Sequence, residues 1–175
     1  IQDGLNLIET RSGSLGRFNV TYEIDDNKLV YATWSEGYRP GGINRKGTLP
    51  PYLSDFLTNY EIGWKTTWAG NQMSFNGAIF REDWDDFQFS YLGQNGLTEI
   101  RNAGQARIEG VEVDLNWAPT YNLSLTGGFA WYDAKLTEDY CAATNPDGSL
   151  DPICFGPRTD DTPDRAFKGS RLPIT

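Results

Sequence analysis

Apolar and polar side chains alternate with a period of two along several stretches of this 175-residue chain. Successive side chains of a β-strand point to opposite faces of a sheet, so a period of two gives a strand one apolar and one polar face. A helix would repeat its apolar positions every three or four residues instead. The pattern therefore predicts an all-β fold. In residues 17–24 the apolar positions are Phe18, Val20, Tyr22 and Ile24.

Five further segments are typical of strands, and they are separated by segments rich in Gly, Asn, Asp and Pro. The segment after the first turn alternates poorly, so the sequence does not assign its two faces. The segment that begins at Met73 is expected to run to about Leu92, well past the ~9–11 residues that a transmembrane strand needs. The five segments are residues 28–37, 59–68, 73–92, 111–117 and 123–132.

The connections between these segments alternate in length. Short turns at residues 25–27, 69–72 and 119–122 follow the first, third and fifth strands, whereas long polar segments at residues 38–58 and 139–172 follow the second and sixth. All short turns therefore fall at one end of the sheet and the long loops at the other. Outer-membrane barrels show this asymmetry, while a soluble sandwich has turns of mixed length at both ends.

Aromatic residues make up 14% of the chain, and several of them stand where a strand meets a short turn. Tyr22, Trp68, Trp117 and Tyr121 are expected at one level, as an aromatic belt at a membrane interface requires. Aromatic side chains also favour strands in general, so the same placement fits a soluble sheet. The longest apolar runs are only a few residues, which excludes a transmembrane helix.

Composition excludes several classes of function. The sequence has no His, 15 Lys plus Arg and 24 Asp plus Glu, which gives a formal net charge of −9. Without His the chain cannot build a Ser-His-Asp or Cys-His catalytic group or a His-based zinc site. An acidic chain also lacks the basic surface of a nucleic-acid binder. We therefore expect no enzymatic activity, no metal, no cofactor and no nucleic-acid partner.

Five motifs give the chain a resemblance to a known family. They are VYATWSEGYRPGG at residues 30–42, NYEIGWK at 59–65, FREDWDDFQ at 80–88, NAGQARIEGVE at 102–112 and RLPIT at 171–175. In this order and spacing they resemble the barrel of TonB-dependent outer-membrane receptors, over nearly the whole chain from about residue 18. The pattern NAG-x-A-x-x-x-GVE is the most specific of the five.

The resemblance implies an antiparallel transmembrane β-barrel meander, of which this chain would supply about six strands of a 22-stranded type. It implies a transporter in the bacterial outer membrane that binds and imports a scarce nutrient, such as a ferric siderophore, haem, cobalamin or a glycan. The implied partners are the lipid bilayer, lipopolysaccharide, the nutrient and the TonB complex, which acts through a plug. We expect residues 1–175 to be part of one barrel domain that lacks its plug and C-terminal strands, so that this piece alone transports nothing.

The long loops, rather than the strands, are expected to carry ligand contact, because loops on a rigid scaffold usually do. In the first long loop Tyr38, Arg39, Arg45 and Tyr52 are the expected first contacts. The cations there could pair with an anionic ligand such as a ferric chelate. Lipopolysaccharide phosphates or solvent are equally compatible partners for them.

Cys141 and Cys154 are the only two cysteines, and both lie in the last loop. A surface loop in an oxidising compartment favours a disulfide between them. Closing so short a loop stabilises it by roughly 3 kcal/mol in the chain-entropy model. Two cysteines without His make a metal site there unfavourable.

The sequence leaves one alternative open, a soluble β-sandwich that binds carbohydrate through its Trp and Tyr side chains. A sandwich packs its apolar face against a second sheet, whereas a barrel turns that face to lipid. The barrel predicts that each strand pairs with its sequence neighbour and that Glu109, Glu112 and Asp114 lie near the interior, although solvent-facing carboxylates fit residues 110–117 equally well. It also predicts one shared, exposed outer face for Phe18, Val20, Tyr22, Ile62, Trp64, Val111, Val113, Leu115, Leu123, Leu125 and Phe129.

Overall fold

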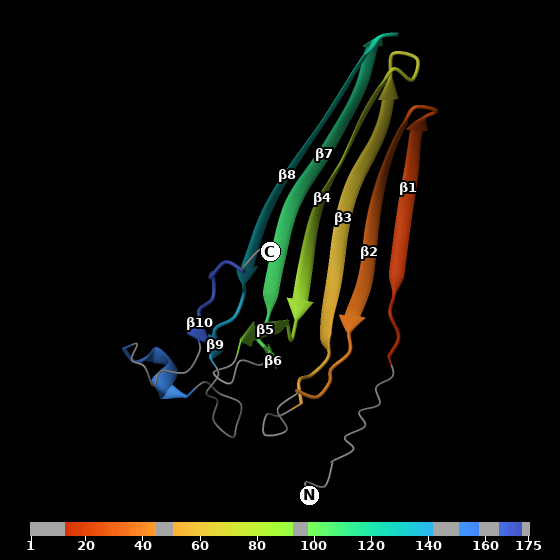
Figure 1. The fold of residues 1–175 in the computed structure, drawn as a ribbon. Coiled ribbons are helices and arrows are strands. Elements are labelled where there is room, and N and C mark those ends of the chain that lie inside the picture. The colour runs from red at the N-terminus through yellow and green to blue at the C-terminus, as the bar shows by residue number, and fades with distance from the viewer. Residues whose placement is uncertain (1–12, 45–50, 93–97, 142–150, 158–164, 173–175) are drawn as a thin grey trace, which may run out of the picture.

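The computed structural model of the chain describes residues 13–44, 51–92, 98–141, 151–157 and 165–172. One antiparallel sheet contains, in spatial order, β1 (Arg17–Asp25), β2 (Lys28–Arg39), β3 (Asp55–Trp68), β4 (Met73–Asp85), β7 (Ala106–Thr120) and β8 (Leu123–Leu136) (Figure 1). The end of the sheet that carries the long connections, here called the loop end, has two pairs of short antiparallel strands and the 3₁₀ turn η1 (Pro152–Phe155). The pairs are β5 (Gln88–Leu92) with β6 (Thr98–Asn102) and β9 (Tyr140–Cys141) with β10 (Arg165–Ala166). No helix in these residues is long and apolar enough to cross a membrane.

Each long strand pairs with the next long strand along the chain, which confirms the predicted meander. The short turns lie at the top of Figure 1 and the long connections at the bottom. In the turn after β3, Ala69, Gly70 and Asn71 all have φ between 53° and 69°, the left-handed conformation that a tight reversal uses. In the first turn the Asp25 carboxylate accepts a hydrogen bond from the Asn27 N–H at 2.9 Å.

Residues 73–92 do not form one strand, so that prediction is wrong. β4 ends before Asp86, which has a φ of 53°, and β5 then leaves the large sheet to pair with β6. The Asn102 side chain donates to the Asp86 carbonyl at 2.7 Å and fixes this corner. Several long strands also extend further toward the loops than predicted. The predicted strands are too short because charges such as Arg107 and Lys135 interrupt the apolar alternation near those ends.

The pairing register confirms the predicted outer face. Residues opposite one another on neighbouring strands point to the same side of a sheet. One such row crosses all six strands through Val20, Ala32, Ile62, Ile79, Val111 and Trp131. The other residues predicted for this face lie at steps of two from that row, so all of them share the side.

Exposure of the outer face is uneven. Phe18, Tyr22 and Phe129 are 62–68% exposed. The expectation of an exposed side chain is wrong for Trp64, Val111, Val113 and Leu115, which are partly buried. The two remaining sheets have two strands each, and the large apolar face stays open. The described strands therefore do not support the β-sandwich alternative.

The opposite, inner face is polar. Glu112 lies on it, opposite Ala78 and Ala130, and Asp114 follows two residues later, as predicted. The Tyr31 hydroxyl donates to Glu61 Oε1 at 2.7 Å across two strands of this face. In an outer-membrane barrel this polar side faces the interior.

Glu109 is the exception among the predicted interior carboxylates. It lies on the outer face, because it stands two residues from Val111 and side chains alternate along a strand. Its neighbours in the register are Arg81 on β4 and Asp133 on β8. The charge is tolerated there because Glu109 lies on the loop side of the apolar rows.

Candidate functional site

The long connections are bound to one another at the loop end of the sheet. The first runs from Pro40 to Ser54, the second contains the β5–β6 hairpin, and the third contains β9, η1 and β10. Hydrogen bonds between side chains and backbone link the first two, and an aromatic pair links the second to the third. The loops that sequence analysis assigned to ligand contact therefore form one connected structure.

An ion pair between a buried carboxylate and a half-exposed arginine stands at the base of the first loop. Asp55 is 1% exposed, and its carboxylate accepts two hydrogen bonds from Arg39 Nε, at 3.1 and 3.0 Å, and a further one from Nη2. Trp84 Nε1 at 2.9 Å and the Gln88 N–H at 3.1 Å also donate to Asp55 Oδ2. A buried carboxylate needs this many donors to offset its loss of hydration. Arg39 in turn lies 4.8 Å from the centre of the Trp84 ring.

Side-chain amides extend this connection between the first loop and the β5–β6 hairpin. Gln88 Nε2 donates to the Leu53 carbonyl at 2.8 Å. Asn102 both accepts from the Leu53 N–H at 2.7 Å and donates to its carbonyl at 3.0 Å. Asn44 does the same for Ile100, at 2.8 and 2.9 Å. An amide side chain that pairs with both the N–H and the C=O of one residue imitates a strand neighbour, so the two loops are joined almost like strands of a sheet.

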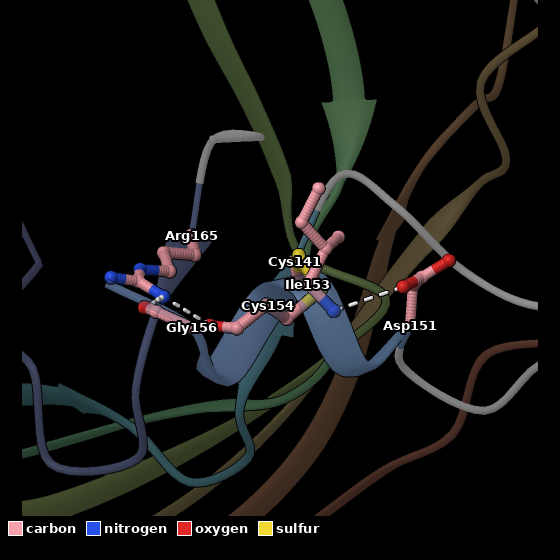
Figure 2. Close-up of a disulfide and its surroundings, with 6 residues drawn as sticks. All are labelled: Cys141, Asp151, Ile153, Cys154, Gly156 and Arg165. Carbon is pink, nitrogen blue, oxygen red and sulfur yellow. Dashed lines mark hydrogen bonds between the residues drawn. A yellow bond between two sulfur atoms is a disulfide. The ribbon is translucent and has the colours of Figure 1, made fainter. Parts of the chain in front are cut away.

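A disulfide organises the third loop, as predicted. Cys141 and Cys154 are bonded with an S–S distance of 2.01 Å, and both are buried. Figure 2 shows how η1 forms next to the bond: Asp151 accepts from the Ile153 N–H at 2.9 Å, and Arg165 donates to the Gly156 carbonyl at 2.8 Å. The bond therefore lies in a small folded unit.

Aromatic rings connect and cover this unit. Tyr140 of β9 meets Phe89 of β5 edge to face at 5.0 Å, which joins the third loop to the second. Phe155 and Phe167 stack at 6.4 Å with the Arg165 guanidinium 5.5 Å from the Phe167 ring. Phe155 is 60% exposed, so this stack presents an apolar, aromatic surface at the loop end.

The three predicted ligand contacts that the structure describes, Tyr38, Arg39 and Tyr52, do not converge on one point. Tyr38 lies on the outer face and stacks on Phe56 at 6.4 Å, whereas its neighbour Arg39 points to the inner face. Tyr52 pairs with Gly42 through two backbone hydrogen bonds, and its ring covers that glycine. Arg45 lies outside the described residues. Of the three described residues, only Arg39 belongs to the network that joins the loops.

Sequence reasoning missed the residues that hold the loops together, namely Asp55, Trp84, Gln88, Asn102 and Asn44. The motif at residues 80–88 contains two of them, Trp84 and Gln88, but its resemblance predicts only a strand there. The described residues contain no group of three or more side chains that could hold a metal ion. What the geometry offers is a polar and aromatic surface for binding.

Known proteins are similar to this chain in sequence and in fold. The family model for the β-barrel of TonB-dependent receptor-like proteins matches residues 3–173. The pesticin receptor of Yersinia enterocolitica is 30% identical over 119 residues, which are 65% of this chain and 17% of that receptor. The chain thus spans well under a fifth of this relative's length.

Two solved structures are similar in fold. The ferric yersiniabactin uptake receptor FyuA from Yersinia pestis gives a TM-score of 0.58 at 25% identity, over 70% of this chain and 18% of that one. The siderophore receptor PiuA from Acinetobacter baumannii gives 0.62 at 18% identity, over 90% of this chain and 21% of that one. Together with the family match over residues 3–173, they show that this chain belongs to the TonB-dependent receptors of the Gram-negative outer membrane, as part of their β-barrel.

Proposed function

We propose that the full-length protein is an active transporter that binds a ferric siderophore or a similar scarce nutrient and imports it with energy transmitted by TonB. The proposal rests on the connected loops at one end of the six-stranded sheet, which are joined through Asp55 and the side-chain amides of Asn102 and Gln88. Similar proteins include a ferric-pyoverdine receptor and the ferric yersiniabactin uptake receptor. Binding and transport, rather than catalysis, are the role we assign to this protein.

The remaining parts of the transporter follow from the same proposal. Residues 1–175 contribute to a single barrel domain, whose plug and C-terminal strands lie outside this chain. Six long strands cannot enclose a barrel of about 22 strands, so this piece does not transport by itself. The outer face meets the lipid bilayer, and TonB acts through the plug. The net charge of −9 supports the absence of a nucleic-acid partner.

The test is nutrient uptake by the full-length receptor. A strain that lacks its own siderophore receptors, but produces this one, is supplied with radiolabelled iron on a panel of siderophores. We expect uptake of one chelate that stops when TonB is deleted, while binding at the cell surface continues. Binding without TonB-dependent uptake of any chelate, haem or cobalamin would contradict active transport.

Residues of the loops 38–58 and 139–172 make the ligand contacts in this proposal, with Tyr38, Arg39, Arg45 and Tyr52 as first contacts. Arg39 holds Asp55 while half of its own side chain stays exposed, so it can still face a ligand. Tyr38 is expected to contribute least, because it lies on the outer face.

Ligand affinity of Arg39→Ala and Arg45→Ala, alone and combined, tests these contacts, with Lys28→Ala at the opposite end of the sheet as control. Because Arg39 also holds Asp55, Arg45→Ala separates ligand contact from loop structure. We expect losses at both low and high salt, since direct pairing is screened less than long-range attraction. Wild-type affinity in the double variant would remove both arginines from the site.

A further inference from the structure

The strand β5 has an open edge at the loop end, beside the guanidinium group of Arg39 (Figure 1). We propose that this edge binds an extended peptide segment of the imported nutrient, with the C-terminal carboxylate of that segment on Arg39. The inference rests on the proposed function, to which it adds the chemical class of the ligand.

The backbone groups of β5 alternate between its partner β6 and the opposite edge. In an antiparallel pair, successive residues direct their N–H and C=O groups to opposite edges of the strand. Gln88 directs both groups away from β6, because its N–H donates to Asp55 Oδ2 at 3.1 Å and its carbonyl accepts from Arg39 Nη2 at 3.0 Å. Ser90 follows two residues later on β5, so its N–H and C=O point to the same edge.

The register with β6 gives the same result independently. Ile100 stands opposite Ser90, and both of its backbone groups bind the Asn44 side chain, at 2.8 and 2.9 Å. Ser90 and Ile100 therefore form one of the pairs that are not joined by hydrogen bonds. In the part of the chain that the structure describes, the N–H and C=O of Ser90 have no hydrogen-bond partner, and the residue is exposed.

The corner at Asp86 opens this edge. β4 lies between β3 and β7, whereas β5 belongs to a two-stranded sheet with β6, because the φ of 53° at Asp86 turns the chain out of the large sheet. Proteins usually cover such edges, since an open edge pairs with any extended chain. Side chains cover the edge positions of Gln88 and Ile100, but Ser90 stays open. Such an edge can add a peptide as a further strand.

The ion pair sets the direction of the peptide. Arg39 and Asp55 occupy the place of a neighbouring strand at Gln88, so a peptide that pairs with Ser90 must end there. A peptide antiparallel to β5 runs toward Gln88 and presents its C-terminal carboxylate to Arg39. A parallel peptide would instead bring its ammonium group to the guanidinium, which repels it. Alternate residues of a strand are ~7 Å apart, which sets the distance between that carboxylate and the peptide group on Ser90.

Arg39 offers the donors that a carboxylate needs. Among the described residues its bonds to Asp55 and Gln88 use Nε and Nη2, which leaves Nη1 for a ligand. The Trp84 ring, 4.8 Å away, holds the guanidinium in place, and half of the Arg39 side chain is exposed. Asp55 cancels the charge of Arg39, so oriented N–H groups rather than net charge bind the carboxylate.

Peptide binding by the purified full-length receptor tests the proposal without iron or TonB. The probes are two synthetic hexapeptide libraries, one with free C-terminal carboxylates and one amidated, and native mass spectrometry identifies the bound peptides. We expect the best peptide with a free carboxylate to bind about tenfold more tightly than its amidated form, because a charged hydrogen bond is lost. Equal binding of the two forms would overturn the contact with Arg39.

Proline substitutions test the strand edge itself. Ser90→Pro removes the open N–H and should weaken peptide binding about fivefold or more, while a strand edge tolerates proline at such a position. Thr98→Pro is the matched control: Thr98 is exposed, lies two residues before Ile100 on β6 and faces the other edge, so this variant should bind as the wild type does. Wild-type binding by Ser90→Pro, or an equal loss in Thr98→Pro, would overturn the proposal.

Methylation of the peptide amides decides the mode of binding, also if Ser90→Pro does not fold as judged by circular dichroism. Binding should fall when a methylated amide faces β5 and persist for the amides between, since a strand has a period of two. Loss at every amide or at none would overturn the proposal. Protection of the Ser90 amide from hydrogen exchange in the ligand-free receptor would do so too, because another segment of the receptor would then cover the edge.

The outcomes separate this inference from the proposed function. Peptide binding without TonB-dependent uptake would contradict active transport and leave the peptide edge in place. TonB-dependent uptake of a chelate at the wild-type rate by Ser90→Pro, with no peptide bound by either protein, would overturn the peptide edge and leave the transporter in place.

Discussion

The wall and the loop end of this molecule bury different groups. We call the six-stranded sheet the wall, and the described parts of the three long connections, with the adjoining strand ends, the loop end. Among the described residues the fully buried apolar side chains all lie at the loop end, while many large apolar side chains of the wall, such as Ile62, Ile79 and Phe129, stay exposed. The buried polar residues lie there too: Asn44, Ser54, Asp55 and Glu99. The loop end is thus built like a small soluble protein, and the wall is not.

This difference predicts two kinds of sensitivity to mutation. The wall is held by its backbone ladder and by the lipid around it, so the effect of a substitution depends on which face it changes. The loop end is held by specific partners, so the effect depends on which partner is lost. Substitutions in both regions test whether the cost depends on the face in the wall and on the lost partner at the loop end.

The largest effect is expected from a charge on the outer face of the wall. Val113 lies opposite Gly77 and Phe129, close to the middle of the apolar band. Val113→Lys should lower the free energy of unfolding in lipid vesicles by about 3 kcal/mol, because the ammonium group enters hydrocarbon. Glu112→Lys, one residue away on the inner face, is the control and should cost far less. Equal costs, measured by denaturant titration of the full-length receptor, would remove the distinction between the faces.

The disulfide gives the next effect, at the loop end. Cys141 and Cys154 are 13 residues apart. Replacing both with Ser should destabilise the third loop by roughly 3 kcal/mol in the chain-entropy model. The cost is smaller if other contacts still hold the loop closed in the unfolded chain. Limited proteolysis should then cut near η1, while the wall stays intact. Loss of the whole barrel at the same denaturant concentration would mean that the two regions are not independent.

The wall could be predicted from sequence because its pattern is local. A strand that faces lipid on one side and a polar interior on the other must alternate, and residues 17–24 and 111–117 do so. The prediction of the faces fails where the strands leave the lipid-facing part of the sheet. For Glu109 the charge predicts the interior, whereas its position two residues from Val111 places the side chain on the outer face.

The loop end could not be predicted in the same way, because its contacts join distant residues without any period. Asn102 pairs with Leu53, 49 residues away, and Arg39 with Asp55, 16 residues away. Nothing in the sequence marks these partners. The two cysteines were the exception, since two cysteines in one loop allow a single pairing.

A smaller effect at the loop end is expected from Asp55→Asn. The substitution keeps the size of the side chain but removes the charge that Arg39, Trp84 and Gln88 share, which should cost about 2 kcal/mol because hydrogen bonds to charged groups are lost. Hydrogen exchange should speed up in residues 40–44, 51–54 and 88–92 and stay unchanged in the wall. Asp85→Asn, an exposed carboxylate at the end of β4, is the control. Faster exchange throughout the wall would show that Asp55 supports the entire sheet.

The smallest effect concerns the inner face of the wall, where polar groups pair within the sheet. Tyr31 donates to Glu61 at 2.7 Å, and its ring covers Gly63 closely. Tyr31→Phe keeps the ring over the glycine and removes only the hydroxyl, so it isolates one hydrogen bond, which is worth about 1 kcal/mol. Tyr22→Phe on the outer face, 68% exposed, should change nothing measurable. The free energy of unfolding of both variants in vesicles decides the point. A cost for Tyr31→Phe as large as that of Val113→Lys would mean that the inner face behaves like a buried core, and the contrast between the wall and the loop end would then fail.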